Sequence, residues 1–225
     1  GRTVFRVTEV SGFAHGTCHQ ITDEDAEWMH DNDKFAILTL TLFDNMSGNR
    51  QYPDYETKGF LKNPLITDAL GKEVVSDYYA GFRMIREGFE DGEGGLYQSQ
   101  LFPNLKQLLT DNQANAMTLR KANVLVGMGT DAAFPPGTWP GEAMHRELEL
   151  HVAGGVPPLE AIKMATFNGA KILTQEHEFG SIVKGMQADI LIVRGDPSTD
   201  ITATRNVEHV IIDGKLIDRK ALQAK

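Results

Sequence analysis

The stretch Val124–Ala132 constrains the fold of this chain more than any other segment. It begins with an apolar run, Val-Leu-Val, that is typical of a strand buried in a parallel sheet. Two glycines follow, and a carboxylate, Asp131, stands directly after the strand. Because the carboxyl ends of parallel strands carry the chemistry in α/β proteins, Asp131 is a candidate metal ligand, general base or both. The structural alternative is an aspartate that caps the following turn.

Two earlier segments also have strand character. A short strand is expected near Gly12–His15, and Phe35–Phe43 is rich in strand-forming residues. Between them, Thr22 is a candidate N-cap with Asp25 three residues later, which predicts the start of a helix. Strand, helix and strand in this order predict an α/β fold with a parallel sheet.

Helical spacing continues through most of the chain up to residue 178. Helices are expected over Lys72–Glu87, Leu101–Lys121, Glu142–Ala153 and from Pro158 to about Leu173. After residue 178 the pattern changes to short strands, with Asp213-Gly214 as a hairpin turn. We therefore predict a catalytic α/β region over residues 1–178 and a β segment over residues 179–225.

The number of parallel strands is small for a closed barrel. An eight-stranded α/β barrel takes about 250 residues, whereas the pattern reveals three parallel strands, the last one ending near residue 129. The chain is therefore expected to be the later part of a larger barrel. The alternative is that residues 44–110, the least readable part, contain further strands.

Charge and composition exclude several classes of partner. The net charge of -9 argues against nucleic acid, whose phosphates require a basic face. No apolar run approaches the roughly 20 residues of a membrane-spanning helix, so we expect no membrane partner. The single cysteine, Cys18, forms no internal disulfide, which fits a reducing compartment and a cytoplasmic protein.

His15 is the candidate partner of Asp131. It ends the first expected strand, so it precedes a loop at the same side of the sheet as Asp131. A neutral imidazole and a carboxylate suit a divalent metal such as zinc, although a catalytic zinc usually has three protein ligands. The structural alternative is a histidine hydrogen-bonded to the backbone at the strand end.

Other residues near the expected mouth of the barrel are candidate substrate contacts. His145 lies early in the helix after the proline-rich loop, Trp139 lies in that loop, and His19 follows the first strand. Trp139 is either a pocket wall or a lid residue, and His19 is either a substrate contact or a loop residue. His151, with Glu147 one turn before it, is interpreted as a surface pair.

Several segments, taken in order, resemble the metal-dependent amidohydrolase superfamily. They are Ala14–Thr17, Ile21–Asp25, Gly129–Ala132, His145–Leu150, Ala153–Ile162, Ala165–Ala170, Phe179–Ile182, Gly185–Ile190 and Gly195–Pro197. The resemblance is to the branch of imidazolonepropionase and the Xaa-Pro dipeptidases. It implies that His15 is the histidine of the sixth barrel strand and Asp131 the aspartate of the eighth. The chain would then hold about strands 6–8 of a (β/α)8 TIM-like barrel, followed by a small β-sandwich segment.

The resemblance also implies a reaction. A divalent metal, zinc in one or two copies, activates water for hydrolysis of amide or cyclic amide C–N bonds, with Asp131 and His15 as metal ligands and Asp131 as the proton carrier. His-x-His occurs nowhere in this sequence, and the family's bridging lysine and fifth-strand histidine are not found. We therefore expect the isolated chain to be a partial, inactive enzyme.

The competing hypothesis is a non-catalytic half-barrel that needs a partner chain. A Rossmann-type nucleotide binder is disfavoured because no glycine-rich turn of the right kind follows a strand. The expected partners are a small amide or dipeptide-like substrate and further copies of the chain in a homo-oligomer.

Overall fold

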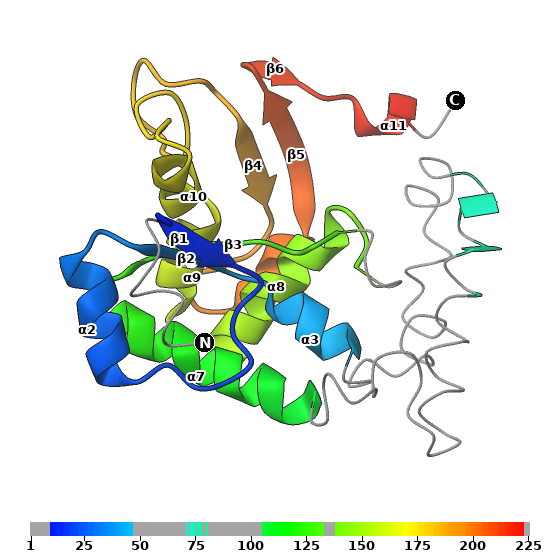
Figure 1. Cartoon of the computed structure of the whole chain (residues 1–225). Coiled ribbons are helices and arrows are strands. Elements are labelled where there is room, and N and C mark those ends of the chain that lie inside the picture. The colour runs from blue at the N-terminus through cyan, green and yellow to red at the C-terminus, as the bar shows by residue number, and fades with distance from the viewer. Residues whose placement is uncertain are drawn as a thin grey trace.

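A parallel sheet packed against helices forms the first part of the molecule, and an antiparallel sheet follows it (Figure 1). The computed structural model describes residues 10–46, 105–132 and 138–222, with isolated positions between 71 and 80. The helix expected over Lys72–Glu87 lies almost wholly outside the described residues. None of the helices in these ranges combines the length and apolar character that crossing a membrane requires.

The parallel sheet has the order β1-β2-β3 among the described residues. Its strands are β1 (Gly12–Ala14), β2 (Phe35–Leu38) and β3 (Leu125–Met128). Ala14 aligns with Ile37, and Ile37 aligns with Gly127, so all three strands end at one edge of the sheet. This arrangement confirms the three parallel strands expected from the sequence.

The strand expected over Phe35–Phe43 is wrong in its second half. β2 ends at Leu38, and helix α3 (Leu40–Met46) begins two residues later. The backbone N–H groups of Leu40 and Thr41 both donate to the carboxylate of Glu147, more than 100 residues away. This distant acceptor satisfies the N–H groups that begin α3, so a tertiary contact overrides the local preference for a strand.

Helix α2 (Asp23–Asp31) joins β1 to β2 and begins as the sequence predicts. Thr22 has extended dihedral angles, and its hydroxyl oxygen accepts the N–H of Asp25 at 3.2 Å. Three acidic residues fill the first turn, where they interact favourably with the positive end of the helix dipole. Ala26 and Met29 are buried, as expected.

Helices α7 (Leu105–Lys121), α8 (Glu142–Ala153), α9 (Pro158–Ala165) and α10 (Phe167–Ile172) follow in the chain. The expected single helix from Pro158 to Leu173 is divided at Thr166, which has φ -126° and ψ -90°. The hydroxyl of Thr166 donates to the carbonyl of Ile162, a bond that competes with regular helix pairing. The break lets the Asn168 side chain donate to the carbonyl of Val126 at 2.7 Å, on the outer side of β3.

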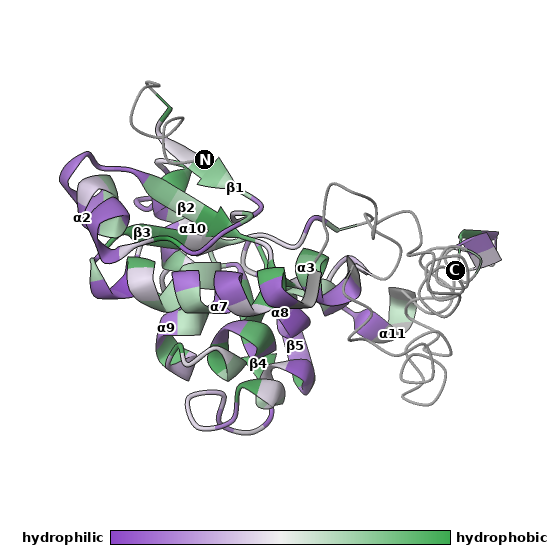
Figure 2. Cartoon of the chain, turned by 60° about the horizontal axis from the view of Figure 1, so that its bottom comes forward, coloured by the Kyte–Doolittle hydropathy of each residue, from purple (hydrophilic) through white to green (hydrophobic). Residues whose placement is uncertain are grey.

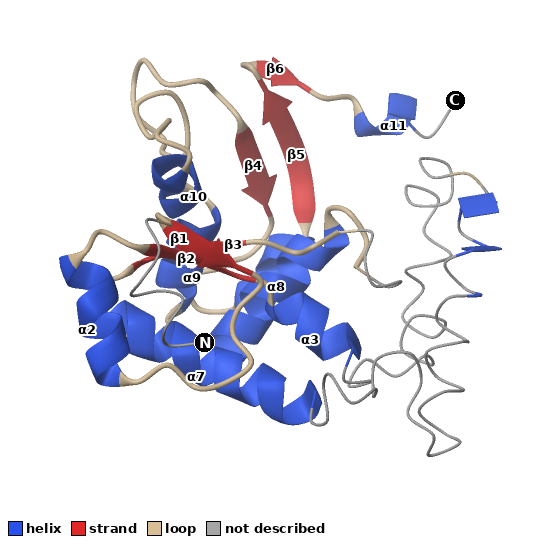
Figure 3. Ribbon diagram, viewed as in Figure 1, coloured by secondary structure: helices blue, strands red, loops and turns tan. Residues whose placement is uncertain are grey.

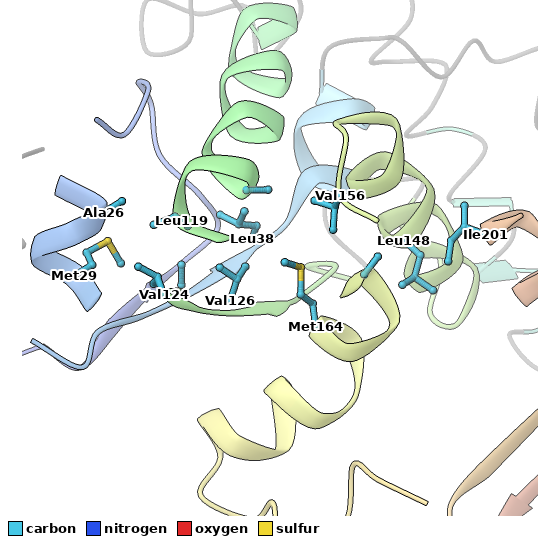
Figure 4. Packing of buried hydrophobic residues seen from close by; sticks show 13 residues of the cluster. Ala26, Met29, Leu38, Leu119, Val124, Val126, Leu148, Val156, Met164 and Ile201 are labelled. Carbon is cyan, nitrogen blue, oxygen red and sulfur yellow. The ribbon is translucent and has the colours of Figure 1, made fainter. Parts of the chain in front are cut away.

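The main core lies between one face of the parallel sheet and helices α2, α7, α8 and α9 (Figure 4). Ala36, Leu38 and Val126 point from the sheet into this core and are buried. In the view of Figure 3, α2 and α7 lie below the sheet and α10 lies above it. Figure 2 shows the three strands as mainly hydrophobic, whereas α2 and α7 alternate hydrophobic and hydrophilic segments, as helices packed on one side do.

The last part of the chain forms a three-stranded antiparallel sheet in the described residues. Its elements are β4 (Ile190–Val193), the 3-10 helix η2 (Ile201–Arg205), β5 (Val207–Ile212), β6 (Lys215–Leu216) and the short helix α11 (Arg219–Leu222). Asp213 and Gly214 have φ values of 50° and 72°, as a type I′ hairpin turn requires, so the predicted hairpin is confirmed. The complete β-sandwich and the boundary at residue 178 stay predictions.

Candidate functional site

His15 and Asp131 lie at the same edge of the parallel sheet. His15 directly follows β1, and Asp131 lies three residues after β3, with β2 between the two strands. Neighbouring strands lie about 4.8 Å apart, so the backbones of β1 and β3 are separated by roughly 10 Å. Two side chains that extend toward each other across β2 can bridge such a separation through a shared cation.

Both residues have left-handed backbone conformations, with φ of 72° for His15 and 50° for Asp131. The imidazole of His15 is exposed, and Asp131 is half-buried. Within residues 10–46, 105–132 and 138–222, no hydrogen bond or ion pair engages either of these two side chains. Left-handed conformations are uncommon for residues with side chains and concentrate at functional sites. The two donor groups are therefore free to bind a ligand.

The described residues supply two potential metal ligands at this edge rather than a complete set. No group of three or more His, Cys, Asp or Glu side chains that could hold a metal occurs among them. A catalytic zinc usually has three protein ligands and a water. The His15 and Asp131 donors therefore fit a metal in chemical type, and a complete site requires at least one further donor.

Two buried asparagines of α7 hold the loop that carries His15. Asn112 accepts the N–H of Thr17 and donates to its carbonyl, both at 2.8 Å. Asn115 accepts the N–H of Ile21 and donates to the Thr17 hydroxyl and to the carbonyl of His19. Both asparagines are at most 1% exposed. The loop after β1 is therefore fixed by side-chain amides from a helix more than 90 residues later.

Glu147 and His151 form a completely buried pair, which shows that their interpretation as a surface pair is wrong. Both side chains are 0% exposed, and His151 Nε2 lies 3.1 Å from Glu147 Oε1. The spacing of four residues correctly indicates that they are neighbours on α8. It does not reveal that α3 and α7 cover this face of the helix, which is the reason for the burial.

The end of β2 contacts the loop that carries Asp131. The N–H of Gly129 donates to the carbonyl of Leu38 at 3.0 Å, and the Thr41 hydroxyl lies 3.4 Å from the carbonyl of Thr130. On the other side, the Thr138 hydroxyl donates to the carbonyl of Asp131 itself. The backbone of Asp131 is therefore held from both sides, whereas its carboxylate is not.

The remaining predicted site residues lie at different places. His145 is half-buried at the contact of α8 with η2, where its Nδ1 lies 3.1 Å from the Thr204 hydroxyl oxygen. Burial, and secondarily the positive charge of Arg205, lower the pKa of His145 below its usual value. Trp139 is 1% exposed and packs inside the molecule, whereas His19 is exposed on the loop after β1. Their roles toward a substrate stay predictions.

Sequence reasoning missed the residues that organise the surroundings of the site. These are Asn112, Asn115, Thr41 and Glu147, whose partners are far away in the sequence. Asn112 and Asn115 are three residues apart on a helix that also presents apolar side chains to the core. Polar residues on the apolar face of a predicted helix are therefore the signal that could have identified them.

Comparisons with known proteins show which family the chain resembles. The model of the amidohydrolase family matches residues 14–217. Ochratoxinase of Aspergillus niger is 32% identical over 170 residues, which are 73% of this chain and 32% of that protein. Imidazolonepropionase of Christiangramia forsetii is 31% identical over 120 residues, which are 51% of this chain and 29% of that protein. The chain thus spans about a third of the length of these relatives.

A solved structure shares the fold of the chain. A Xaa-Pro dipeptidase crystallised with bound methionine in its active site superposes with a TM-score of 0.60 and 23% identity, over 92% of this chain and 40% of that one. The family has a TIM-barrel fold, and the parallel β/α arrangement described above is consistent with part of such a barrel. The resemblance to the amidohydrolase superfamily is therefore confirmed, with an imidazolonepropionase among the similar proteins.

Proposed function

This chain belongs to the amidohydrolase family, and on that premise we propose that it carries part of the active site of a metal-dependent hydrolase of C–N bonds. The proposed substrates are small amides, cyclic amides or dipeptide-like molecules. Two of the similar proteins, the imidazolonepropionase and the Xaa-Pro dipeptidase, are named for substrates of this kind. The proposed assembly has barrel strands 6–8 in residues 1–178 and a β-sandwich segment in residues 179–225.

One observation carries the proposal. His15 and Asp131 follow two parallel strands at the same sheet edge, and their side chains are unengaged by the described residues. An imidazole nitrogen and a carboxylate oxygen are suitable ligands for zinc or a similar divalent cation. In this proposal both residues hold the metal, and a complete site needs at least one further donor that the described residues do not supply.

A metal bound by His15 and Asp131 would supply Lewis acidity, which would polarise the scissile carbonyl and lower the pKa of a water molecule toward about 7. The chain's own residues perform the remaining tasks. Asp131 accepts a proton from the attacking water through its carboxylate and passes it to the leaving nitrogen. His15 would be a metal ligand or, if the site held a single ion, a contact for the substrate oxygen. His145, His19 and Trp139 are the proposed substrate contacts.

The competing function is that of a non-catalytic half-barrel that folds with a partner chain. It is supported by the two-ligand count, because no group of three metal-binding side chains occurs in the described residues. We further propose a cytoplasmic protein that assembles into a homo-oligomer, without nucleic-acid or membrane partners. The acidic charge of -9 supports the absence of a nucleic-acid partner.

The proposal is tested first by Asp131→Asn in the protein that contains the complete barrel. The amide keeps the shape of the side chain but accepts no proton, so turnover falls by at least about 100-fold whereas the thermal midpoint is retained. Metal content of the purified protein is measured together with hydrolysis. Near wild-type turnover in the Asp131→Asn variant would refute the assignment, and a protein with neither metal nor activity favours the non-catalytic module.

A second test uses the chain itself and does not depend on turnover. Paramagnetic Co²⁺ is titrated into the isotope-labelled chain, and the broadening of histidine resonances is followed by NMR. The His15 resonances are expected to broaden at low Co²⁺ concentration. In the Asp131→Asn variant this broadening of His15 is expected to disappear. The matched control is His177→Gln, which removes a histidine whose side chain is 70% exposed. If Asp131→Asn leaves the His15 broadening unchanged, the two residues share no cation.

A further inference from the structure

The buried carboxylate of Glu147 accepts hydrogen bonds from four donors. The backbone N–H of Leu40 donates to Oε1 at 2.8 Å, and the N–H and hydroxyl of Thr41 donate to Oε2 at 2.7 Å each. His151 Nε2 is the fourth partner, at 3.1 Å from Oε1. Because a backbone N–H donates to each oxygen, the arrangement requires an acceptor at both oxygens, which a carboxylate provides and an amide does not.

The tautomer of His151 follows from the same contacts. Its Nδ1 atom is buried and has no hydrogen-bond partner among the residues that the structure describes. An imidazolium would place an unpaired N–H there, which is costly, whereas a neutral ring places a lone pair. The hydrogen-bond pattern therefore fits the tautomer of His151 that donates from Nε2 to Glu147 and carries a lone pair at Nδ1.

The residues that Glu147 holds lie next to the proposed catalytic centre. Leu40 and Thr41 follow β2, the strand between those that lead to His15 and Asp131. The end of β2 is joined to the Asp131 loop by the bond from Gly129 N–H to the Leu38 carbonyl. The Thr41 side chain also contacts the carbonyl of Thr130, the neighbour of Asp131, at 3.4 Å.

Space between the end of β2 and the loop that carries Asp131 is limited as well. A side-chain carbon added at Gly129 would lie 3.0 Å from Ile37 and 3.2 Å from Thr39, both in or beside β2. A shift of the β2 end therefore displaces the loop at Gly129, because side-chain methyl groups of Ile37 and Thr39 already lie close beside the Gly129 backbone. The position of Asp131 consequently depends on where the β2 end is fixed.

We propose that Glu147 is a positioning residue for Asp131, which acts through Thr41 and the end of β2. This inference rests on the proposed role of Asp131 as a metal ligand and proton carrier. Glu147 reaches neither substrate nor metal in this arrangement. It sets the height of the β2 end relative to β3, and thereby the place from which the Asp131 carboxylate faces His15.

A matched set of variants separates positioning from a merely structural role. Thr41→Val removes the hydroxyl contacts with Glu147 and Thr130 but leaves the backbone bonds, and Thr41→Ser restores the hydroxyl. Glu147→Gln replaces one acceptor oxygen by a donor of the same shape. Glu160→Gln, on the neighbouring helix α9, removes a carboxylate that makes no described hydrogen bond or ion pair and serves as the charge control.

The readouts are the NMR resonances of the Asp131 backbone and side-chain carboxyl, and the Co²⁺ affinity of the His15–Asp131 pair. Thr41→Val and Glu147→Gln are expected to shift the Asp131 resonances and to weaken Co²⁺ binding about tenfold, the usual effect of disturbing residues behind a metal ligand. Thr41→Ser and Glu160→Gln should match the wild type.

Two outcomes keep the hypotheses apart. If Asp131 shifts but the wild-type chain shows no Co²⁺ binding at the His15–Asp131 pair, the positioning stands and the proposed function fails. If Thr41→Val folds, and the changes remain confined to Leu40, Thr41 and α8 while Asp131 is unchanged, positioning by Glu147 is overturned. Because Thr41→Val retains both backbone bonds to Glu147, it keeps the test decisive even if Glu147→Gln fails to fold.

Discussion

His145 Nδ1 and the Thr204 hydroxyl oxygen, 3.1 Å apart, join α8 to η2. The Thr204 hydroxyl donates its single proton to the carbonyl of Ile201 at 2.9 Å, so it accepts a hydrogen bond from His145. Burial first, and the nearby charge of Arg205 second, lower the pKa of His145 below its usual 6.5. Glu142 and Glu149 oppose this shift. The histidine is therefore neutral over a wider pH range in the folded chain than in the unfolded one.

The lowered pKa of His145 predicts a loss of stability in mild acid. Below pH 6.5 the unfolded chain binds a proton at His145 before the folded chain does, so the free energy of unfolding decreases as the pH falls from 6.5 toward the folded pKa. His145→Gln removes this contribution and flattens the pH dependence in that window. Urea unfolding between pH 5 and 8 measures the effect, with His177→Gln as the exposed control. Parallel curves for the wild type and His145→Gln would contradict the prediction.

Arg205 is expected to stabilise the contact between η2 and α8. Its guanidinium donates to Glu149 at 2.5 Å and to Glu142 at 3.0 Å, and all three side chains are largely buried. Arg205→Ala leaves two carboxylates with fewer donors and is expected to lower the free energy of unfolding by about 2–3 kcal/mol. Denaturant unfolding measures this decrease in the free energy of unfolding. Arg194→Ala is the control, because it removes a more exposed ion pair with Glu208. If Arg194→Ala lowered the free energy of unfolding as much as Arg205→Ala, burial would not explain the stability of the Arg205 pairs.

Removing the side-chain amide of Asn112 should loosen the loop that carries His15. Asn112→Ala leaves the N–H and the carbonyl of Thr17 without their buried partner, at a cost of about 1–3 kcal/mol for each group. Amide hydrogen exchange at Thr17 is expected to accelerate more than the global stability loss explains. Asn206→Ala, at an exposed position with a long 3.4 Å bond, is the control. Unchanged relative protection at Thr17 would show that Asn112 does not hold the loop.

Two glycines should respond in opposite ways to alanine. A side-chain carbon at Gly12 would lie 2.4 Å from the carbonyl oxygen of Phe35, a backbone atom that cannot move without disturbing β2. Gly12→Ala is therefore expected to destabilise the chain by about 1–3 kcal/mol. Gly169, inside helix α10, has open space around it, and Gly169→Ala is expected to stabilise by about 0.5–1 kcal/mol. Thermal unfolding compares the two variants with the wild type. Equal midpoints for Gly12→Ala and Gly169→Ala would refute the steric argument.

Local signals predicted much of the fold. The Thr22 cap, the helix over Leu105–Lys121, the strand before Asp131 and the Asp213-Gly214 turn each depend on residues close in sequence. Their geometry follows from capping, helical spacing and turn preferences, which act over a few residues. The placement of His15 and Asp131 at one sheet edge followed from the parallel strand order. Whether they bind metal stays a prediction.

The parts that could not be predicted depend on contacts between distant segments. The sequence Leu40–Phe43 alone favours a strand, and the Glu147 carboxylate, 107 residues after Leu40, makes it a helix. Glu147 and His151 have the composition of an exposed pair, and the packing of α3 and α7 buries them. The division of the helix at Thr166 likewise accompanies a bond from Asn168 to β3.

The Asn168 amide occupies the Val126 carbonyl of β3, the border strand of the parallel sheet in the described residues. A strand at the border of a sheet normally offers its carbonyl and N–H groups to any extended chain that arrives, which is a route to fibrils. At β3 an incoming strand must first displace a 2.7 Å bond from a half-buried side chain. Any strand that pairs with β3 at this position, from the rest of the proposed barrel or from another molecule, therefore meets an acceptor that is already in use.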